Sequence, residues 1–503
     1  MRGILSVTFV LLCLSFILRV PYYFGVYLAT PQFLAIGLIF AFFLHFLSSK
    51  KPFRWIDGLP IVFGIPGAAF IAFFYNQALD AYEGYGFLDI KGIILVFSLA
   101  IALIIIVWRR TGLAMPVIIT CLTLIVRFQR YLPGVLYGPG YDMGSLGYSF
   151  YIGTHGIFGV PFKTACTVLV PFILFGILFD ATGGGEWFMK LAARLLGSMR
   201  GGIASTSVLA SAFFGMISGS PSANTASTGS ITIPAMIRSG YPPSLAGAIE
   251  AAASTGGQFT PPVMGAIIFI MAEWISIPYW QIVKMAAIPA FLYYVVVFST
   301  IYFEALKNKR SLTALSETVP ISKLLREGWL YIIPILGLIL LLLVFKYEPG
   351  EAVIFSVLML IACSFLSSDK QRRLYPHKIY KNLVKGVESW LTVGAVTSAV
   401  GMVIGALSLS GLGVKFSAFL INISGGHLIP LLVLVGLSSL ILGMGMDSIP
   451  CYITVAILTA PALVKAGIPV FAAHLFVIYW GMQQKERLQK KRFSESMTFP
   501  YIL

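Results

Sequence analysis

An acidic residue, several hydroxyl residues and two pairs of helix-breaking residues lie close together in the segment 250–266, EAAASTGGQFTPPVMGA. A Thr-Gly-Gly begins at Thr255 and a Thr-Pro-Pro begins at Thr260. Carbonyl oxygens freed by an opened helix, together with Ser and Thr hydroxyls, form the hard oxygen shell that a small cation such as sodium prefers. A restarted helix also presents its positive N-terminal end to an anion. The segment therefore predicts a helix that opens at 255–257 beside a cation and an anionic solute.

A second polar stretch, SGSPSANTASTGS at 218–230, is expected to form the tip of a re-entrant hairpin. An isolated Ser in a membrane helix usually serves close packing, but a cluster of Ser, Asn, Thr and Gly that has a counterpart elsewhere in the chain favours function. Glu250 has two open interpretations, because an intramembrane carboxylate is functional by default but could also hydrogen-bond to the hairpin. Asp447 would either bind a cation directly or cap the helix that starts at Ile449.

These polar stretches lie within a chain of 503 residues that is 58% hydrophobic and only 11% charged. Apolar runs such as 92–108 and 328–345 are long enough for a helix to cross about 30 Å of hydrocarbon. The net charge of +16 comes from short basic clusters between these runs, which is the positive-inside pattern of membrane proteins and does not indicate nucleic-acid binding. The sequence predicts an all-α polytopic membrane protein.

An internal repeat relates two parts of the chain. TIPAMIRSGYP (232–242) and TAPALVKAGIP (459–469) match at an offset of 227 residues, and small polar residues precede both copies, in GMISGSPSANT (215–225) and GMGMDSIP (443–450). Non-helical backbone in a bilayer is tolerated only where protein or a wet cavity satisfies it. Paired interruptions in two repeats indicate the binding site of a secondary transporter. We therefore expect inverted repeats with two re-entrant hairpins and broken helices.

Composition and the repeat divide the chain into five expected parts. They are a small-subunit-like helical bundle (1–130), an extracytoplasmic linker rich in Gly and Tyr (131–153), repeat 1 (154–310), connecting helices (311–385), and repeat 2 (386–503) with a basic tail (483–503).

Three segments resemble the membrane component of tripartite ATP-independent periplasmic (TRAP) transporters: GTHGIFGVPF (153–162), the segment 215–274, and ILGMGMDSIPCYITVAILTAPALVKAGIP (441–469). The order of a four-helix part followed by a larger one resembles the fused small/large subunit branch (4TM/12TM) that works with TAXI-type binding proteins. The resemblance implies an elevator mechanism in the bacterial inner membrane. It also implies sodium-coupled uptake of a small organic carboxylate delivered by a periplasmic binding protein, with sodium ions as coupling ions and no other metal or cofactor.

The resemblance also implies site residues. Sodium would bind at Ser218, Gly219, Ser220, Asn224, Thr255, Gly256, Gly443, Gly445 and Asp447. Substrate would bind at Ser222, Thr225, Glu250, Ser254, Gln258, Thr260, Pro261 and Ser448.

The C-terminal end departs from the family pattern. A second Thr-Pro-Pro is expected at 487–489, where the chain has Arg487, Leu488 and Gln489. We expect a truncated or frameshifted end, an incomplete second ion site and impaired transport; a natural short tail would also account for these residues. Two further functions stay open, an elevator carrier that needs no binding protein and a non-transporting membrane subunit. An enzyme is not expected, because the sequence has no HExxH and no Ser/His/Asp arrangement.

Overall fold

The computed structural model describes residues 1–49, 55–219, 221–308, 320–367, 369–444, 446 and 448–482. Every regular element within these ranges is a helix. Eight of the described helices are long and apolar enough to cross a membrane, by length and composition. The prediction of an all-α, polytopic membrane protein is confirmed. The basic tail and the positions 487–489 lie outside the described residues.

The chain forms two compact units. Unit 1 comprises Met1–Val170, Glu273–Ile275 and Leu383–Met482, and unit 2 comprises Pro171–Ala272 and Ser276–Asn382. The bundle expected at 1–130 and the described part of repeat 2 therefore share unit 1. The linker expected at 131–153 contains a short helix, α7 (Met143–Tyr151). The expected five-part division stays a prediction.

Unit 1 begins with the helices of the N-terminal bundle and ends with those of repeat 2. Its elements are α1 (Arg2–Ile17), α2 (Val20–Tyr23), α3 (Thr30–Ser48), α4 (Trp55–Tyr82), α5 (Ile90–Thr111), α6 (Ala114–Arg127), η1 (Gln129–Tyr131), η2 (Gly134–Leu136), α7, α8 (Val160–Thr164), η3 (Ala165–Leu169), most of α19 (Pro376–Ser410), α20 (Leu412–Ile423), α21 (Leu428–Gly443), α22 (Ser448–Lys465) and α23 (Val470–Met482).

Unit 2 holds most of repeat 1 and of the connecting helices. Its elements are most of α9 (Val170–Ala181), α10 (Gly184–Leu196), α11 (Gly202–Ser218), α12 (Pro221–Ser227), α13 (Gly229–Arg238), α14 (Pro243–Gly257), most of α15 (Ala266–Trp274), α16 (Tyr279–Lys307), α17 (Ile321–Leu343), α18 (Pro349–Phe365) and η4 (Lys370–Arg372).

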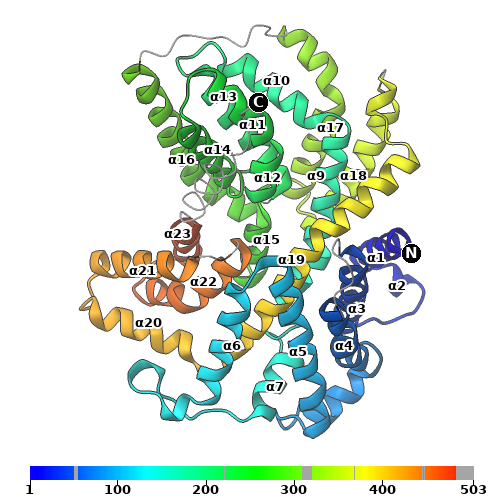
Figure 1. Ribbon diagram of the computed structural model, residues 1–503, viewed down its shortest axis with the longest axis vertical. Helices are drawn as coiled ribbons and strands as arrows, with labels where there is room; N and C mark the ends of the chain where they lie inside the picture. Colours follow the sequence, from blue (N-terminus) through cyan, green and yellow to red (C-terminus); the bar gives the residue numbers. More distant parts are fainter. Residues whose placement is uncertain are drawn as a thin grey trace. The chain divides into compact units, whose positions relative to one another are not determined.

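Within unit 2, the chain turns back on itself to form a hairpin. Helix α11 is one limb, and α12 and α13 together form the other, so that α11–α14 form one green group in Figure 1. Gly219 makes the turn in the left-handed conformation, with φ of +65°. Glycine adopts this conformation without the steric cost of a Cβ atom. Glycine also allows α11 and α14 to touch, because a Cβ atom on Gly257 would lie 2.8 Å from the Cα of Gly215.

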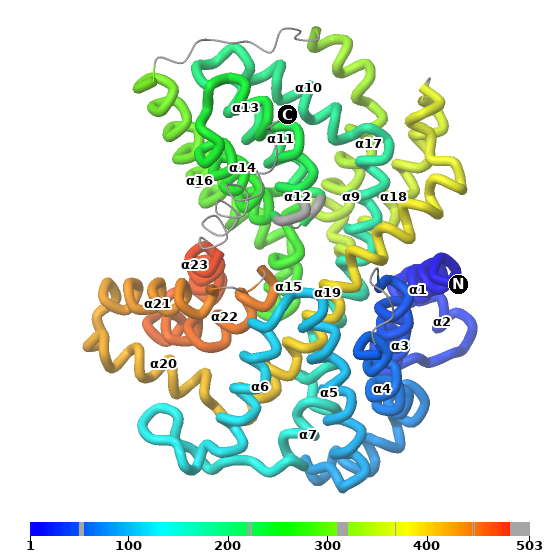
Figure 2. The backbone as a smooth tube through the Cα atoms, in the orientation of Figure 1, coloured from blue at the N-terminus to red at the C-terminus, as the bar shows by residue number. Residues whose placement is uncertain are grey.

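Within unit 1, α21–α23 form a corresponding group, coloured orange to red in Figure 2. The bounds of its second and third helices follow the sequence offset: α22 covers 448–465, the counterpart of 221–238, and α23 starts at Val470, the counterpart of Pro243. The repeat seen in the sequence is therefore also a repeat of helical elements. In this second copy a Cβ atom on Gly443 would lie 2.6 Å from the carbonyl oxygen of Gly481, so α21 and α23 also touch through glycine.

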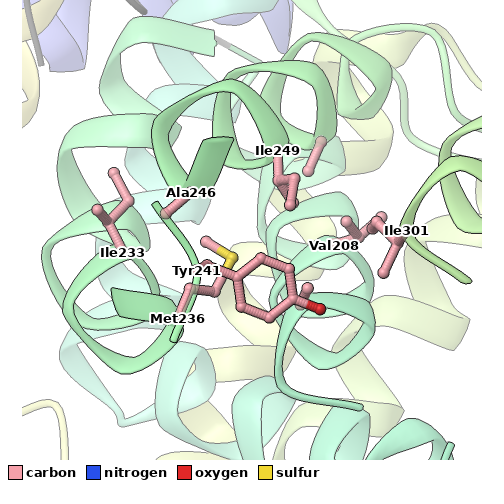
Figure 3. Close-up of a cluster of buried hydrophobic side chains, with 9 residues drawn as sticks. Val208, Ile233, Met236, Tyr241, Ala246, Ile249 and Ile301 are labelled. Atoms are coloured by element: carbon pink, nitrogen blue, oxygen red, sulfur yellow. The ribbon is translucent and has the colours of Figure 1, made fainter. Parts of the chain in front are cut away.

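An apolar cluster holds the hairpin of unit 2 against its neighbours. Val208 of α11, Met236 of α13, Ile249 of α14 and Ile301 of α16 all lie in this cluster, which also contains Tyr241 from the turn between α13 and α14 (Figure 3). All of these side chains are buried. Close van der Waals packing of such side chains drives the association of membrane helices, and here it fixes the helices that carry the polar residues described next.

Candidate functional site

A fully buried carboxylate lies at the centre of the polar side chains of unit 2. Glu250 projects from α14 and has no exposed surface. Thr228, between α12 and α13, donates its hydroxyl to Oε1 of Glu250 over 2.5 Å. Thr232 of α13 donates to Oε2 over 2.7 Å. Both carboxylate oxygens are thus held by hydroxyl groups of the hairpin.

A second set of hydrogen bonds joins this carboxylate to α11. Asn224 donates its amide to the carbonyl oxygen of Ser211 over 2.8 Å and lies 3.0 Å from the hydroxyl of the same residue. The hydroxyl of Ser211 lies 3.0 Å from that of Ser254, one turn along α14 from Glu250. We name the six residues Ser211, Asn224, Thr228, Thr232, Glu250 and Ser254 the hydroxyl cage.

The hydroxyl cage holds a carboxylate without a basic partner. Among the described residues, no Lys, Arg or His makes an ion pair with Glu250, and its polar neighbours are hydroxyls. Asp57 of unit 1 is different, because Arg109 donates to both of its oxygens, over 2.7 and 3.0 Å. Burial of an uncompensated charge is costly. The buried carboxylate of Glu250 therefore requires a proton or a cation for electrical balance.

The turn of the hairpin touches the irregular segment 258–265 that separates α14 from α15. Gln258 donates its side-chain amide to the carbonyl oxygen of Gly219 over 3.1 Å. A Cβ atom on Gly219 would lie 3.3 Å from the backbone nitrogen of Ala266, the first residue of α15. The structure therefore brings together Gly219 and Gln258, two of the residues expected to bind sodium and substrate.

The predicted helix opening at 255–257 is wrong, because α14 continues to Gly257 and the interruption follows at 258–265. The carbonyl oxygens expected to be free are engaged in the turns that end the helix. The carbonyl of Thr255 accepts from the backbone nitrogen of Gln258 over 3.2 Å. The carbonyl of Gly256 accepts from the hydroxyl of Thr260 over 2.6 Å. The physical reason is close packing: Gly256 faces the rings of Tyr293 and Tyr294, as Gly257 faces α11.

Three tyrosines of α16 hold α14 and the irregular segment that follows it, two of them through the segment itself. Tyr279 donates to the carbonyl oxygens of Pro262, over 3.1 Å, and Val263. Tyr293 donates to the carbonyl oxygen of Ala252 over 2.8 Å, and Tyr294 lies within 3.2 Å of the hydroxyl of Thr260. These bonds satisfy carbonyl groups that a non-helical segment leaves without helical partners.

Two of the expected site residues, Thr225 and Thr255, have buried hydroxyls with no hydrogen-bond partner among the described residues. Thr206 of α11 has a third such hydroxyl, but it is not one of the expected site residues. An oxygen atom that is buried and unpartnered costs free energy unless a ligand completes it. The hydroxyls of Thr225 and Thr255 fit the donor chemistry expected of a sodium ligand.

The remaining predicted site residues belong to both units. Gly443 lies against Gly481 in unit 1, and Cys451 donates its thiol to the carbonyl oxygen of Gly481 over 3.3 Å. Ser448 is buried at the start of α22, and Pro261 lies in the irregular segment. The side chains of Ser218 and Ser222 and the residues Ser220, Gly445 and Asp447 lie outside the described part of the structure.

The sequence did not lead us to Ser211, Thr228, Thr232 or the tyrosines of α16. A signal was present, because polar residues recur every four positions on three apolar helices, as in 224–228–232 and 250–254. Residues four apart share one helix face. A search for this spacing would have identified the polar faces that carry Thr228 and Thr232, but not which faces oppose each other.

Comparison with known proteins identifies the family. A model of the family described as "Tripartite ATP-independent periplasmic transporter, DctM component" matches residues 91–485. The C4-dicarboxylate TRAP transporter large permease protein DctM of Pseudomonas aeruginosa is 33% identical over 141 residues, which are 28% of this chain and 33% of that protein. The isethionate TRAP transporter permease protein DctMQ of Oleidesulfovibrio alaskensis is 41% identical over 91 residues, 18% of this chain and 14% of that protein.

The sialic acid TRAP transporter permease protein SiaT of Haemophilus influenzae is 38% identical over 101 residues, 20% of this chain and 16% of that protein. These alignments span a third of the relatives' length or less. The family model, in contrast, covers more than half of this chain, including both repeats and the hydroxyl cage. The chain therefore belongs to the DctM component family of tripartite ATP-independent periplasmic transporters.

Proposed function

We propose that the chain is a sodium-coupled secondary transporter that takes up a small organic carboxylate delivered by a TAXI-type periplasmic binding protein. In this proposal the chain resides in the bacterial inner membrane and works by an elevator movement. Membership of the DctM family and eight apolar helices among the described residues support a transport role. The three relatives named above are, by their names, permeases for C4-dicarboxylate, isethionate and sialic acid, and this supports an organic anion as substrate.

The observation that carries the proposal is the contact between the hairpin turn and the irregular segment of repeat 1. Gly219 and Gln258 meet there, and the buried hydroxyls of Thr225 and Thr255 have no other partner among the described residues. Irregular backbone and small polar groups at such a point are typical of secondary-transporter binding sites. We assign sodium to the turn at Gly219 and to the hydroxyl of Thr255, and the carboxylate to Gln258 and Thr260.

Uptake by proteoliposomes tests the proposal. Full-length protein would be reconstituted with a TAXI-type binding protein from the same organism and offered radiolabelled succinate, isethionate or sialic acid under an inward sodium gradient. We expect uptake that disappears when potassium replaces sodium. We expect Asn224→Ala to lower uptake at least tenfold, since Asn224 ties the hairpin to α11. Ser207→Ala is the matched control, because its hydroxyl donates only to Ile203 of its own helix.

The same assay distinguishes this function from two others. Uptake that does not need the binding protein would favour an independent elevator carrier. No uptake of any of the three solutes with any driving ion, from a folded protein, would favour a non-transporting membrane subunit.

A further inference from the structure

The two repeats differ at the buried carboxylate. At the offset of 227 residues, the counterpart of Glu250 is Val477 and the counterpart of Thr228 is Val455. Both valines have no exposed surface, as Glu250 has none. The third counterpart is a threonine, Thr459, but its hydroxyl donates to the carbonyl oxygen of Val455 in its own helix over 2.8 Å. The second copy therefore packs the same helices with an apolar core at this point.

This difference helps to decide whether Glu250 is a functional carboxylate or only a structural hydrogen-bond partner of the hairpin. Helices α22 and α23 pack together without any acid at position 477. A buried polar network is seldom more stabilising than a well-packed apolar core of similar volume. The carboxylate of repeat 1 is therefore not required to form a hairpin of this type, and its burial calls for a role other than packing.

The groups around the carboxylate suit a positive charge. The side chains that hydrogen-bond to Glu250 are hydroxyls: Ser211 from α11, Thr228 and Thr232 from the hairpin, and Ser254 from α14 itself. The tyrosines of α16 bond elsewhere, Tyr293 to Ala252 and Tyr294 to Thr260. A hydroxyl can donate to a carboxylate or turn its lone pairs to a cation, so these groups can accompany either a proton or a sodium ion.

We propose that the hydroxyl cage is a binding site for one compensating positive charge, a proton or a sodium ion, carried by Glu250 in repeat 1 alone. This inference rests on the proposed function only for its physiological use, in which occupancy of the cage is coupled to movement of the hairpin. The site is separate from the predicted sodium site at the hairpin turn. It gives Glu250 a role in cation binding in place of the contact with substrate that the sequence predicted.

Thermal unfolding of the purified full chain in detergent tests the proposal without any transport assay. The midpoint would be measured at several pH values between 5.5 and 8.5, in sodium chloride and in choline chloride of equal ionic strength. A bound sodium ion raises the midpoint in sodium chloride by mass action. A bound proton is released on unfolding, since an ordinary Glu ionises near pH 4.3. The folded state then loses stability as pH rises, with the unfolding constant increasing up to about tenfold per pH unit.

Two variants and a control decide the outcome. Glu250→Gln should abolish the pH response, or the part of the sodium response that the cage provides, and should leave any sodium response of the hairpin turn. The double variant T228V/E250V, which reproduces the valines of repeat 2, should fold and also lack the response. Thr459→Val should retain the wild-type response.

Glu250→Gln with an unchanged response to both sodium and pH would overturn the proposal. So would failure of the double variant to fold, because the carboxylate would then be structural. Loss of sodium-driven uptake in proteoliposomes, with a cation response that still depends on Glu250, would overturn the transport proposal alone. Uptake that persists without the cation response would overturn only the role of the cage.

Discussion

Gly240 and Gly467, 227 positions apart, follow the ends of α13 and α22 in the same left-handed conformation, with φ of +89° and +88°. The backbone nitrogen of Gly240 donates to the carbonyl of Ile237, and that of Gly467 donates to the carbonyl of Val464, over 2.9 and 3.0 Å. A glycine in this conformation ends a helix without steric cost. The two repeats therefore share a helix-ending motif as well as a sequence pattern.

Replacing Gly467 by alanine should lower the free energy of unfolding by about 1–2 kcal/mol, because a Cβ atom is disfavoured in the left-handed region. No atom lies within 4 Å of the position that this Cβ would occupy, so the cost is purely conformational. A lower unfolding midpoint in detergent would show it. Gly84→Ala is the control, since Gly84 has open space and no positive φ; an equal effect in both variants would contradict the explanation.

The contact between Gly215 and Gly257 predicts a larger effect. A Cβ atom on Gly257 would meet the backbone of Gly215 at 2.8 and 3.0 Å, where no flexible side chain can move away. We expect Gly257→Ala to separate α11 from α14 and to cost about 1–3 kcal/mol, as overpacking does. The unfolding midpoint and sodium-driven uptake should both fall. A variant with wild-type stability would show that the helices can separate freely at this point.

Tyr279 should matter for transport through the segment it holds. Tyr279→Phe removes the hydroxyl that bonds to the carbonyls of Pro262 and Val263. A lost hydrogen bond costs about 1 kcal/mol, which corresponds to roughly a fivefold change in the population of the ordered segment. We expect a comparable decrease in uptake by proteoliposomes. Tyr302→Phe, at a 41% exposed position of the same helix, is the control, and equal uptake by the two variants would contradict this role.

Asp89 provides a prediction about pH at the start of α5. Its Oδ1 accepts the backbone N–H of Gly92 over 2.8 Å and the hydroxyl of Tyr82 over 2.7 Å. These bonds hold the pKa of Asp89 below its ordinary value, with the backbone bond contributing most. The stabilisation is therefore complete above the ordinary pKa, about 3.9, and decreases as pH falls through the lowered pKa in the folded protein.

At neutral pH, Asp89→Ala should lower the free energy of unfolding by about 1 kcal/mol, as loss of an N-cap does. The difference from the wild type should shrink as pH falls below about 4. Unfolding midpoints of both proteins between pH 3 and 7 would measure it. Glu83→Gln, in the preceding connection, controls for removal of an acidic side chain. A difference that stays constant over this range would contradict the assigned role of the charge.

Composition was sufficient for the fold class, because a helix that crosses a bilayer needs a long apolar run and such runs are visible without structural information. The repeat was visible for a related reason: T-x-P-A and the following glycine mark a helix and its end, and both recur with the same spacing. Local sequence did not predict where α14 ends, because packing between helices determines that position. Gly256 and Gly257 were expected to open α14, whereas they make room for tyrosine rings and for α11.

The hydroxyl cage was hidden for the same physical reason. Thr228 and Thr232 looked like ordinary small residues of the hairpin, and their role depends on Glu250, about twenty positions later on another helix. The sequence spacing placed each polar residue on a helix face but did not specify which face opposed it. The contact of Gly219 with Gln258 agrees better with the sequence pattern. Both residues lie where a helix is interrupted, and irregular backbone within a membrane must be buried in protein or line a cavity.

The valine at the counterpart of Glu250 has an electrical consequence. Membrane voltage acts on fixed charge, by about 2.3 kcal/mol per elementary charge for each 100 mV that the charge crosses. A movement of α14, which carries Glu250, across the membrane is therefore voltage-sensitive when the carboxylate is ionised and has no bound cation. The same movement carries no net charge from this residue when a proton or a cation neutralises the carboxylate. The corresponding movement of α23 carries no charge at Val477, whether or not a cation is bound to Glu250.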